Sequence, residues 1–329
     1  AEDRPYHQDN QAENPRVYVM TAEQPAHPVA SLQELDEKIG KQEGVRMEGD
    51  DLVLSPLRAE ELPKSSRELQ KLISARLPHV DLTDLIIEVD TWTRFSEGFT
   101  HAGGATESRD SDFLQYLYAG ILAQACNLGL DKMAEISDLS YDRLAWITNW
   151  FLREETLQPA INNLVNYQFH QPLSRSWGGG TMSSSDGQRF PVAVKARNTT
   201  VVPPYFGYGR ILTFYSWTSD QFSQWGSKPI TSSVRDATYV LDAILDNETE
   251  LPLFEHTTDT AGYTEKIFAF FDCLGFLFSP RIRDLTDQHI YRIDKSTRYI
   301  HLNKIIKGTI NVKLILKHWD AILRVMASL

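Results

Sequence analysis

The chain has 329 residues, 42% of them hydrophobic and 23% charged, a composition typical of soluble globular proteins with room for two domains. No stretch holds the roughly 18 apolar residues that a membrane helix needs, and the polar first residues lack the apolar segment of a signal peptide. The net charge of −11 argues, as an average, against a nucleic-acid-binding protein. We therefore expect no membrane partner.

The first elements along the chain are short. Two capping boxes, Ser31 with Glu34 and Ser65 with Glu68, are typical of helix starts. Between them the segment VRMEGDDLVLS alternates apolar and polar residues around a Gly-Asp pair, which predicts a small hairpin.

A longer helical region follows. Its apolar residues recur at three- and four-residue spacing, and the predicted helices cover 111–129, 140–152 and 155–170. Cys126 and Cys273 lie in apolar helical patterns, so we expect buried free thiols, which suit a reducing cytoplasm. No cysteine or histidine spacing predicts a structural zinc site.

Beyond residue 177 the period becomes that of strands, and the charge changes too. Residues 178–329 hold 17 Lys and Arg against 15 Asp and Glu, so the net charge of the first 177 residues is −13. The second half could therefore still bind a polyanion. Its predicted strands lie around 188–196, 210–218, 228–234, 253–259 and 277–284, with helices from Asp236 and over 263–276.

The order of these elements, β-β-β-α-β-α-β, matches the ribonuclease H-like fold. We therefore predict an α/β fold with a ribonuclease H-like mixed sheet, preceded by a mainly helical domain. In such a sheet the first strand is central and the fourth lies beside it. Asp186 on the first strand and Asp259 at the end of the fourth would then face each other. Two carboxylates there could hold Mg²⁺ or Mn²⁺ across a phosphodiester.

Simpler interpretations of the two acids stay open. An Asp before Gly, as at Asp186, is most often a turn residue, and Asp259 or Thr260 could cap the following helix. Ser184, His256 and Asp259 could form a hydrolytic triad, although no nucleophile-elbow glycines support it. Asp90, in an apolar run beside Trp92, favours helix packing over chemistry.

Basic residues flank the two acids. Isolated surface arginines are usually only solvated, but two of these alternate on one predicted strand and so share a face. Next to a candidate phosphodiester site they are candidates for DNA backbone contact: Arg189, Lys195, Arg197, Arg281 and Arg283.

Three long motifs carry a family resemblance: LIIEVDTWTRFSEGFTH, WGGGTMSSSDGQRF and HTTDTAGYTEKIFAFFDCLGFLFSPRIRDL. From about residue 65 onward the chain resembles the transposases of replicative, cointegrate-forming bacterial transposons, the Tn-three family. The resemblance implies a DDE-type DNA transferase that cuts a 3′ strand at each transposon end and joins it to target DNA with Mg²⁺. Asp186 and Asp259 match the first two acids of its triad.

The third acid of that family, a glutamate on a later helix, has no counterpart here. The segment LNKIIKG at 302–308 has no Glu, and Glu265 lies only six residues after Asp259. The chain also lacks an initiator Met and the family's terminal-repeat-binding domains. We therefore expect an internal piece of a larger transposase, inactive alone.

These observations define one main hypothesis and two rivals. The main one is a transposase catalytic-core fragment, with Mg²⁺ or Mn²⁺ as cofactor and with terminal inverted repeats and target DNA as partners. We expect a full-length homodimer in the bacterial cytoplasm at the nucleoid. The rivals are a degenerate copy that only binds DNA or protein, and an unrelated ribonuclease H-like nuclease. The expected divisions are an α/β-hairpin segment over 1–80, a helical domain over 81–177 and a catalytic domain over 178–329.

Overall fold

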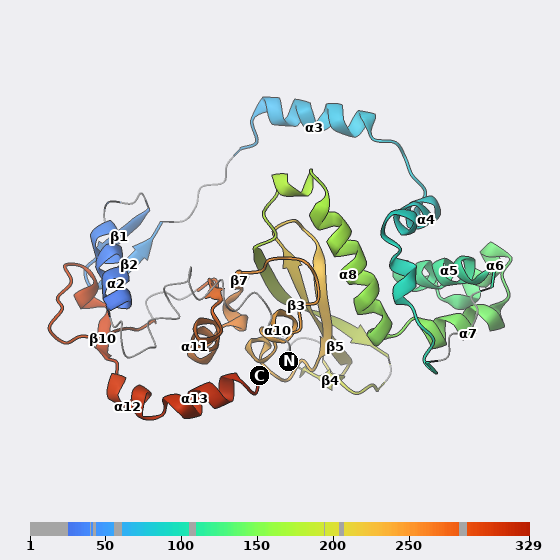
Figure 1. Cartoon of the computed structure of the whole chain (residues 1–329). Helices are drawn as coiled ribbons and strands as arrows, with labels where there is room; N and C mark the ends of the chain where they lie inside the picture. Colours follow the sequence, from blue (N-terminus) through green and yellow to red (C-terminus); the bar gives the residue numbers. More distant parts are fainter. Residues whose placement is uncertain are drawn as a thin grey trace.

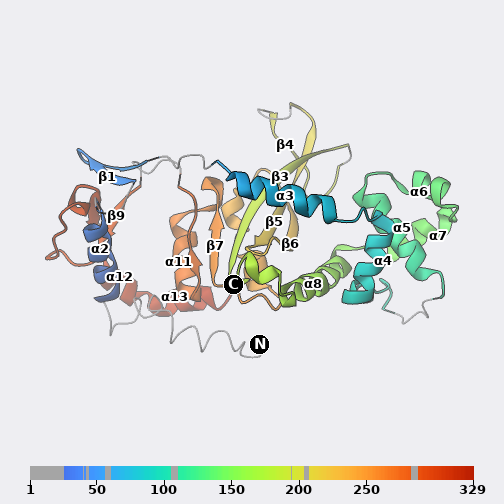
Figure 2. The same ribbon diagram turned by 90° about the horizontal axis from the view of Figure 1, so that it is seen from above.

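The computed structural model describes residues 26–39, 41, 44–55, 61–104, 110–193, 195–203, 207–282 and 288–329. Within them three hydrophobic clusters lie along an elongated molecule. A small α/β unit lies at one end, a sheet in the middle and a helical domain at the other end (Figure 1; Figure 2 shows the same from above). No helix of the described residues is long and apolar enough to cross a membrane.

Five helices of the described residues form the helical domain: α4 (Leu82–Thr93), α5 (Phe113–Ala125), α6 (Leu130–Ser137), α7 (Tyr141–Phe151) and α8 (Glu154–His170). Three of them, α5, α7 and α8, confirm the predicted helices. Fully buried Leu117 and Leu144 lie at its centre. Both cysteines are free thiols, as expected, but Cys126 is exposed at the end of α5 and Cys273 only half-buried.

Asp90 has the packing role that its apolar surroundings predict. Its buried carboxylate accepts hydrogen bonds from the Ser96 amide at 2.8 Å and the Tyr118 hydroxyl at 2.5 Å. Burial, followed by the neighbouring Asp90 charge, raises the pKa of Tyr118, so this hydroxyl stays protonated and donates. Asp90 thereby joins α4 and α5 to the short helix η2 (Phe95–Gly98).

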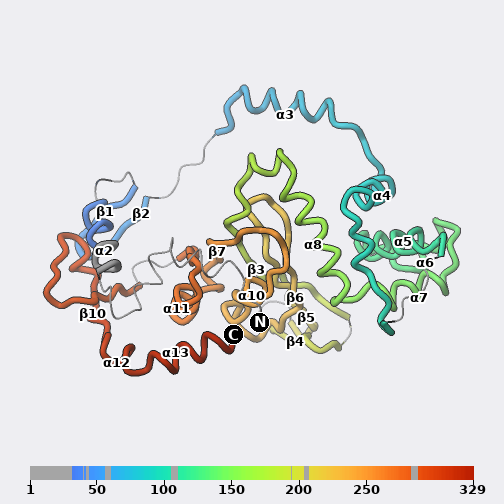
Figure 3. The backbone as a smooth tube through the Cα atoms, viewed as in Figure 1, coloured from blue at the N-terminus to red at the C-terminus, as the bar shows by residue number. Residues whose placement is uncertain are grey.

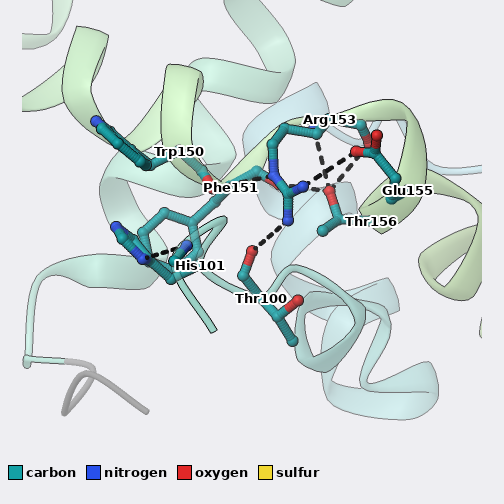
Figure 4. Close-up of polar contacts among 8 residues, drawn as sticks. Thr100, His101, Trp150, Phe151, Arg153, Glu155 and Thr156 are labelled. Carbon is teal, nitrogen blue, oxygen red and sulfur yellow. Dashed lines mark hydrogen bonds and ion pairs between the residues drawn. The ribbon is translucent and has the colours of Figure 1, made fainter. Parts of the chain in front are cut away.

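The junction of α7 and α8 is held by Arg153 (Figure 4). Its guanidinium donates to the carbonyls of Trp150 and Thr100 and pairs with Glu155 at 3.0 Å. From this junction α8 runs along the sheet (Figure 1), with Ala160 in the helical cluster and Val165 in the cluster under the sheet. One helix therefore packs in both cores.

The central sheet is built around β3 (Met182–Val192). It pairs antiparallel with β5 (Arg210–Ser219) and parallel with β7 (Glu255–Thr258), so the strand that carries Asp186 is an inner one. Outside these lie the remaining strands, β4 (Thr200–Val201), β6 (Gln224–Ile230) and β8 (Leu277–Phe278).

The two faces of β3 differ. Ser183 and Ser185 are buried, whereas Ser184 and Asp186 are exposed. The inner face packs on a cluster that α8, α10 (Asp242–Leu245) and α11 (Glu265–Leu274) share with the sheet.

Two predicted elements are shorter than their patterns suggested. The helix expected from Asp236 is only the turn η4 (Asp236–Thr238) followed by α10, and the strand expected over 277–284 is only β8. The helix starts expected from the capping boxes are also wrong. Helix α2 (Ala26–Lys38) begins before Ser31, and α3 (Lys64–Arg76), which has no buried residue, follows Pro63 rather than Ser65.

The third cluster joins segments from opposite ends of the chain. Helix α2 and the predicted hairpin, β1 (Val45–Glu48) with β2 (Asp51–Leu54), pack on β9 (Ile290–Arg292) and β10 (Ile306–Thr309). In Figure 3 the blue and red parts of the backbone lie side by side there. Helices α12 (Val312–Lys317) and α13 (Trp319–Met326) lead back under the sheet.

Asp36 fastens these two segments. Its buried carboxylate accepts amide hydrogen bonds from Ile300 at 2.5 Å, His301 at 2.7 Å and Leu302 at 2.8 Å. Burial opposes ionisation, but the three amides outweigh it, and the pKa of Asp36 lies below its usual value.

We expect Asp36→Ala to destabilise this unit by roughly 1–3 kcal/mol, because three buried amides lose their acceptor. Because the folded-state pKa is lowered, the contribution is complete above the unfolded value near pH 4 and is lost as pH falls further. Urea unfolding at pH values from 7 down to 3 measures both effects. It is monitored by tyrosine fluorescence, and subtracting the signal of a Tyr299→Phe variant isolates the contribution of Tyr299. The exposed Glu37→Gln is the control, and an equal loss in both variants would contradict the role of Asp36.

Candidate active site

Asp186 and Asp259 lie at the same level on neighbouring strands. The last residue pair of the parallel β3–β7 ladder is Ser185 with Thr258. Asp186 is the next residue of β3, and Asp259 directly follows β7 with its backbone still extended. Neighbouring strands are roughly 4.8 Å apart, and successive side chains alternate between faces. Since Ser185 and Thr258 are buried, both acids belong to the opposite face, where they are exposed.

Each carboxylate uses one oxygen locally. Oδ1 of Asp186 accepts from the Gly187 amide at 2.7 Å, and Oδ1 of Asp259 accepts from Ala261 at 2.9 Å and Gly262 at 3.1 Å. Within the described part of the chain neither Oδ2 has a hydrogen bond. The turn interpretation of Asp186 is wrong because it lies within β3, whereas Asp259 does cap a turn, η5 (Thr260–Gly262).

The turn that Asp259 caps is braced from outside the strand. Arg235 donates from Nε to the Ala261 carbonyl at 3.1 Å and from Nη2 to the Thr260 carbonyl at 3.4 Å. The following helix α11 has its own cap, Thr264, whose hydroxyl accepts from the Ile267 amide at 3.3 Å. Asp259 therefore does not cap α11.

Asp236 is a third nearby acid that the sequence did not single out. A Cβ at Gly187 would lie 3.1 Å from its Oδ2, so Asp236 packs against the inner side of β3. Burial raises the pKa of Asp236; the nearby Asp259 and Asp186 raise it further, while Arg189 and Arg235 lower it. The only signal in the sequence is an acid at a helix start, which is usual there.

Asp236 nevertheless does not complete a ligand set. Among the residues that the structure describes, no group of three or more His, Cys, Asp and Glu side chains is placed to hold a metal ion. Asp236 is therefore a neighbouring charged group rather than a ligand: burial, and then the charges of Asp259 and Asp186, raise its pKa.

Beneath the acids lies a buried polar network. His256 contacts the Ser183 hydroxyl through Nδ1 at 2.7 Å and the Ser185 hydroxyl through Nε2 at 2.8 Å, and Ser185 also contacts the Tyr215 hydroxyl at 2.8 Å. Burial lowers the pKa of His256 to about 3, so the ring is neutral. The alternative hydrolytic triad is wrong, because Ser184 is exposed on the other face and the partners of His256 are Ser183 and Ser185.

The basic residues are only partly gathered around the acids. The Arg281 amide donates to the Thr258 carbonyl at 2.8 Å, which puts exposed Arg281 beside the Asp259 turn. Arg189 is on β3, three residues after Asp186, and its charge acts on Asp236. Lys195 and Arg197 are exposed in the connection from β3 to β4, away from β7. Arg283 lies outside the described residues.

Comparison with known proteins identifies the family. Residues 84–329 match the family described as the Tn3 transposase DDE domain. The chain belongs to this family. The resemblance that the three sequence motifs carry is thereby confirmed.

Curated members of the family are long proteins. The chain is 43% identical over 279 residues to the transposase for transposon Tn21 of Escherichia coli. This match covers 84% of the chain and 28% of that protein. The chain is 41% identical to the transposase for transposon Tn501 of Pseudomonas aeruginosa, and the match covers 84% of this chain and 28% of that protein. The chain therefore spans little more than a quarter of the length of these relatives.

One solved structure is a distant match. The piggyBac transposase in a synaptic complex with hairpin DNA is 14% identical, with a TM-score of 0.30, over 59% of this chain and 47% of that one.

Proposed function

We propose that the chain forms part of the catalytic core of a DDE transposase, and that Asp186 and Asp259 are two of its metal-binding acids. The observation that carries this proposal is their level placement, Asp186 on β3 and Asp259 directly after β7. Both residues are exposed, and neither Oδ2 has a hydrogen bond within the described residues. Membership of the Tn3 transposase DDE domain family supports it. The named relatives are transposases.

The strand order supports a ribonuclease H-like fold for the central domain. Strands β3, β5 and β6 form a meander, with the two-residue β4 as an extra strand paired to β5, and β7 and β8 add in parallel on the other side of β3 through short helical connections. In this proposal residues 178–329 would be the ribonuclease H-like domain. The residues over 1–80 and 81–177 would be the hairpin segment and the helical domain.

The donor set fits a hard divalent cation. Free carboxylate oxygens are ligands that Mg²⁺ and Mn²⁺ prefer, and exposure leaves room for the waters that Mg²⁺ keeps. When bound, the cation would supply charge neutralisation at a phosphodiester. Asp186 and Asp259 would hold it, and the Gly187, Ala261 and Gly262 amides would orient the two carboxylates.

In this proposal the substrate is DNA. The whole transposase would cut 3′ strands at terminal inverted repeats and join them to target DNA, as a homodimer in the bacterial cytoplasm. Arg281, beside Asp259, is best placed to contact a phosphate. Lys195 and Arg197 would lie further along the DNA, and Arg189 and Arg283 complete the proposed set. A glutamate in a part of the transposase that this chain does not contain would be the third acid.

The chain itself should bind Mn²⁺ weakly through this pair and show little cleavage alone. Asp186→Asn or Asp259→Asn should weaken binding at least about tenfold, since even outer-shell changes at metal sites cost this much. Water proton relaxation enhancement during Mn²⁺ titration measures the affinity. Glu255→Gln, on the same strand and face as Asp259, is the control. Equal affinities in all four proteins would refute the metal pair.

A further inference from the structure

The buried network beneath the acids crosses three strands. Ser183 and Ser185 come from β3, Tyr215 from β5 and His256 from β7. The imidazole also packs against a stacked pair of rings, with its centroid 5.8 Å from Phe271 of α11 and 6.5 Å from Phe278 of β8. These contacts and burial hold the ring beside β3.

The hydrogen bonds of His256 depend on strand register. Its two nitrogens contact residues i and i+2 of the neighbouring strand, and one nitrogen donates while the other accepts. Both bonds form only when His256 lies opposite Ser183. Any slip would leave a buried serine or a ring nitrogen without its partner, which is costly.

Register also decides whether the two acids meet. A slip of one residue between β3 and β7 would put Asp259 on the opposite face from Asp186. A slip of two residues would keep the face but separate the acids by roughly 6.6 Å along the strands. The ladder is only four pairs long, from Met182 with Glu255 to Ser185 with Thr258, so backbone pairing alone specifies it weakly.

We propose that His256, hydrogen-bonded to both Ser183 and Ser185, is a positioning residue that fixes the β3–β7 register and so holds Asp259 level with Asp186. It acts from the buried face and touches neither acid. An apolar side chain would fill the same space beside Phe271 and Phe278, but it would favour no register over another. The effect of this register lock on metal binding rests on the proposed function, because it needs Asp186 and Asp259 to be metal ligands. Its effect on the pairing of β3 with β7 does not depend on that function.

The first test measures register by disulfide trapping without metal. With Cys126 and Cys273 replaced by serine, a cysteine at Ser184 is paired with one at Thr257, its partner in the ladder, or with one at Glu255, its partner after a two-residue slip. Strand neighbours lie within disulfide reach, and residues two positions apart do not. We expect the in-register product to dominate. Ser185→Ala should lower the ratio of in-register to slipped product about threefold to tenfold, the effect of losing one hydrogen bond.

The second test measures Mn²⁺ affinity in single variants. Ser185→Ala and Ser183→Ala should each weaken binding about tenfold, as loss of supporting contacts does at metal sites. Ser184→Ala is a matched control between them on the strand, with its side chain on the other face. Circular dichroism at the assay temperature confirms that each variant is folded.

The two measurements separate the two ideas. A trapping ratio that Ser185→Ala leaves unchanged overturns the register lock, whatever the metal does. A ratio that falls while the wild-type chain binds no Mn²⁺ upholds the lock and overturns the proposed metal pair. Equal Mn²⁺ affinities for Ser184→Ala and Ser185→Ala, whether at or below that of the wild type, overturn the lock's role in positioning the acids.

Discussion

Asp186→Ala or Asp259→Ala should abolish Mg²⁺-dependent strand cleavage in a Tn21 transposase whose matching segment is replaced by this chain. We expect a loss of about 10³-fold or more, because metal charge stabilisation is worth several kcal/mol and each 1.36 kcal/mol is a factor of ten in rate. The assay follows 3′-end cleavage and joining of a labelled transposon-end duplex. The chimera supplies the segments that the chain, at 28% of the relative's length, does not span.

The matched control for that experiment is Glu255→Gln. Glu255 is on the same strand and face as Asp259 but four residues earlier, roughly 13 Å along the strand. Its replacement should leave cleavage near the chimera's level. Full activity in both alanine variants would mean that Asp186 is only a strand residue and Asp259 only a cap.

Phe271→Ala should unfold the sheet domain more readily than any surface change, by about 3–5 kcal/mol. The ring is fully buried and stacks on Phe278 at 4.5 Å and His256 at 5.8 Å, so its loss leaves a cavity under β7. Guanidinium unfolding followed by tryptophan fluorescence reports the change, because Trp217 and Trp225 are buried in the same cluster.

Phe268→Ala, on the same helix, is the comparison. Its ring is 37% exposed, and we expect a clearly smaller loss of stability. Equal losses would show that the cavity beneath β7 does not govern stability.

Local patterns predicted the sheet and helices well where periodicity was long. The hairpin around Gly49, the helices α5, α7 and α8 and the strands β5 and β7 followed from local residue patterns, whereas α6 (Leu130–Ser137) did not. The capping boxes at Ser31 and Ser65 failed because their helices begin earlier, and a capping motif inside a helix looks the same in sequence as one at its start.

The candidate site was predictable only in part. Asp186 and Asp259 could be paired because strand order puts their strands side by side. The surroundings of Asp236 and His256 depend instead on contacts between distant segments. Besides burial, the charges of Asp259 and Asp186, 23 and 50 residues away, raise the pKa of Asp236, and His256 bonds to a serine 73 residues earlier. No local period carries that information.

The unit that Asp36 holds together cannot complete its folding until residues 300–302 have been synthesised. Its hydrogen bond to Ile300 spans 264 residues, and a ribosome adding 5–20 residues per second needs roughly 13 to 50 s to make them. Until then the apolar side chains of Leu32, Val45 and Met47 lack the surface they pack on. Within the described chain, helix α2 and its hairpin are thus the first segments to leave the ribosome, and they lack part of their packing surface until residues 290–306 have been made.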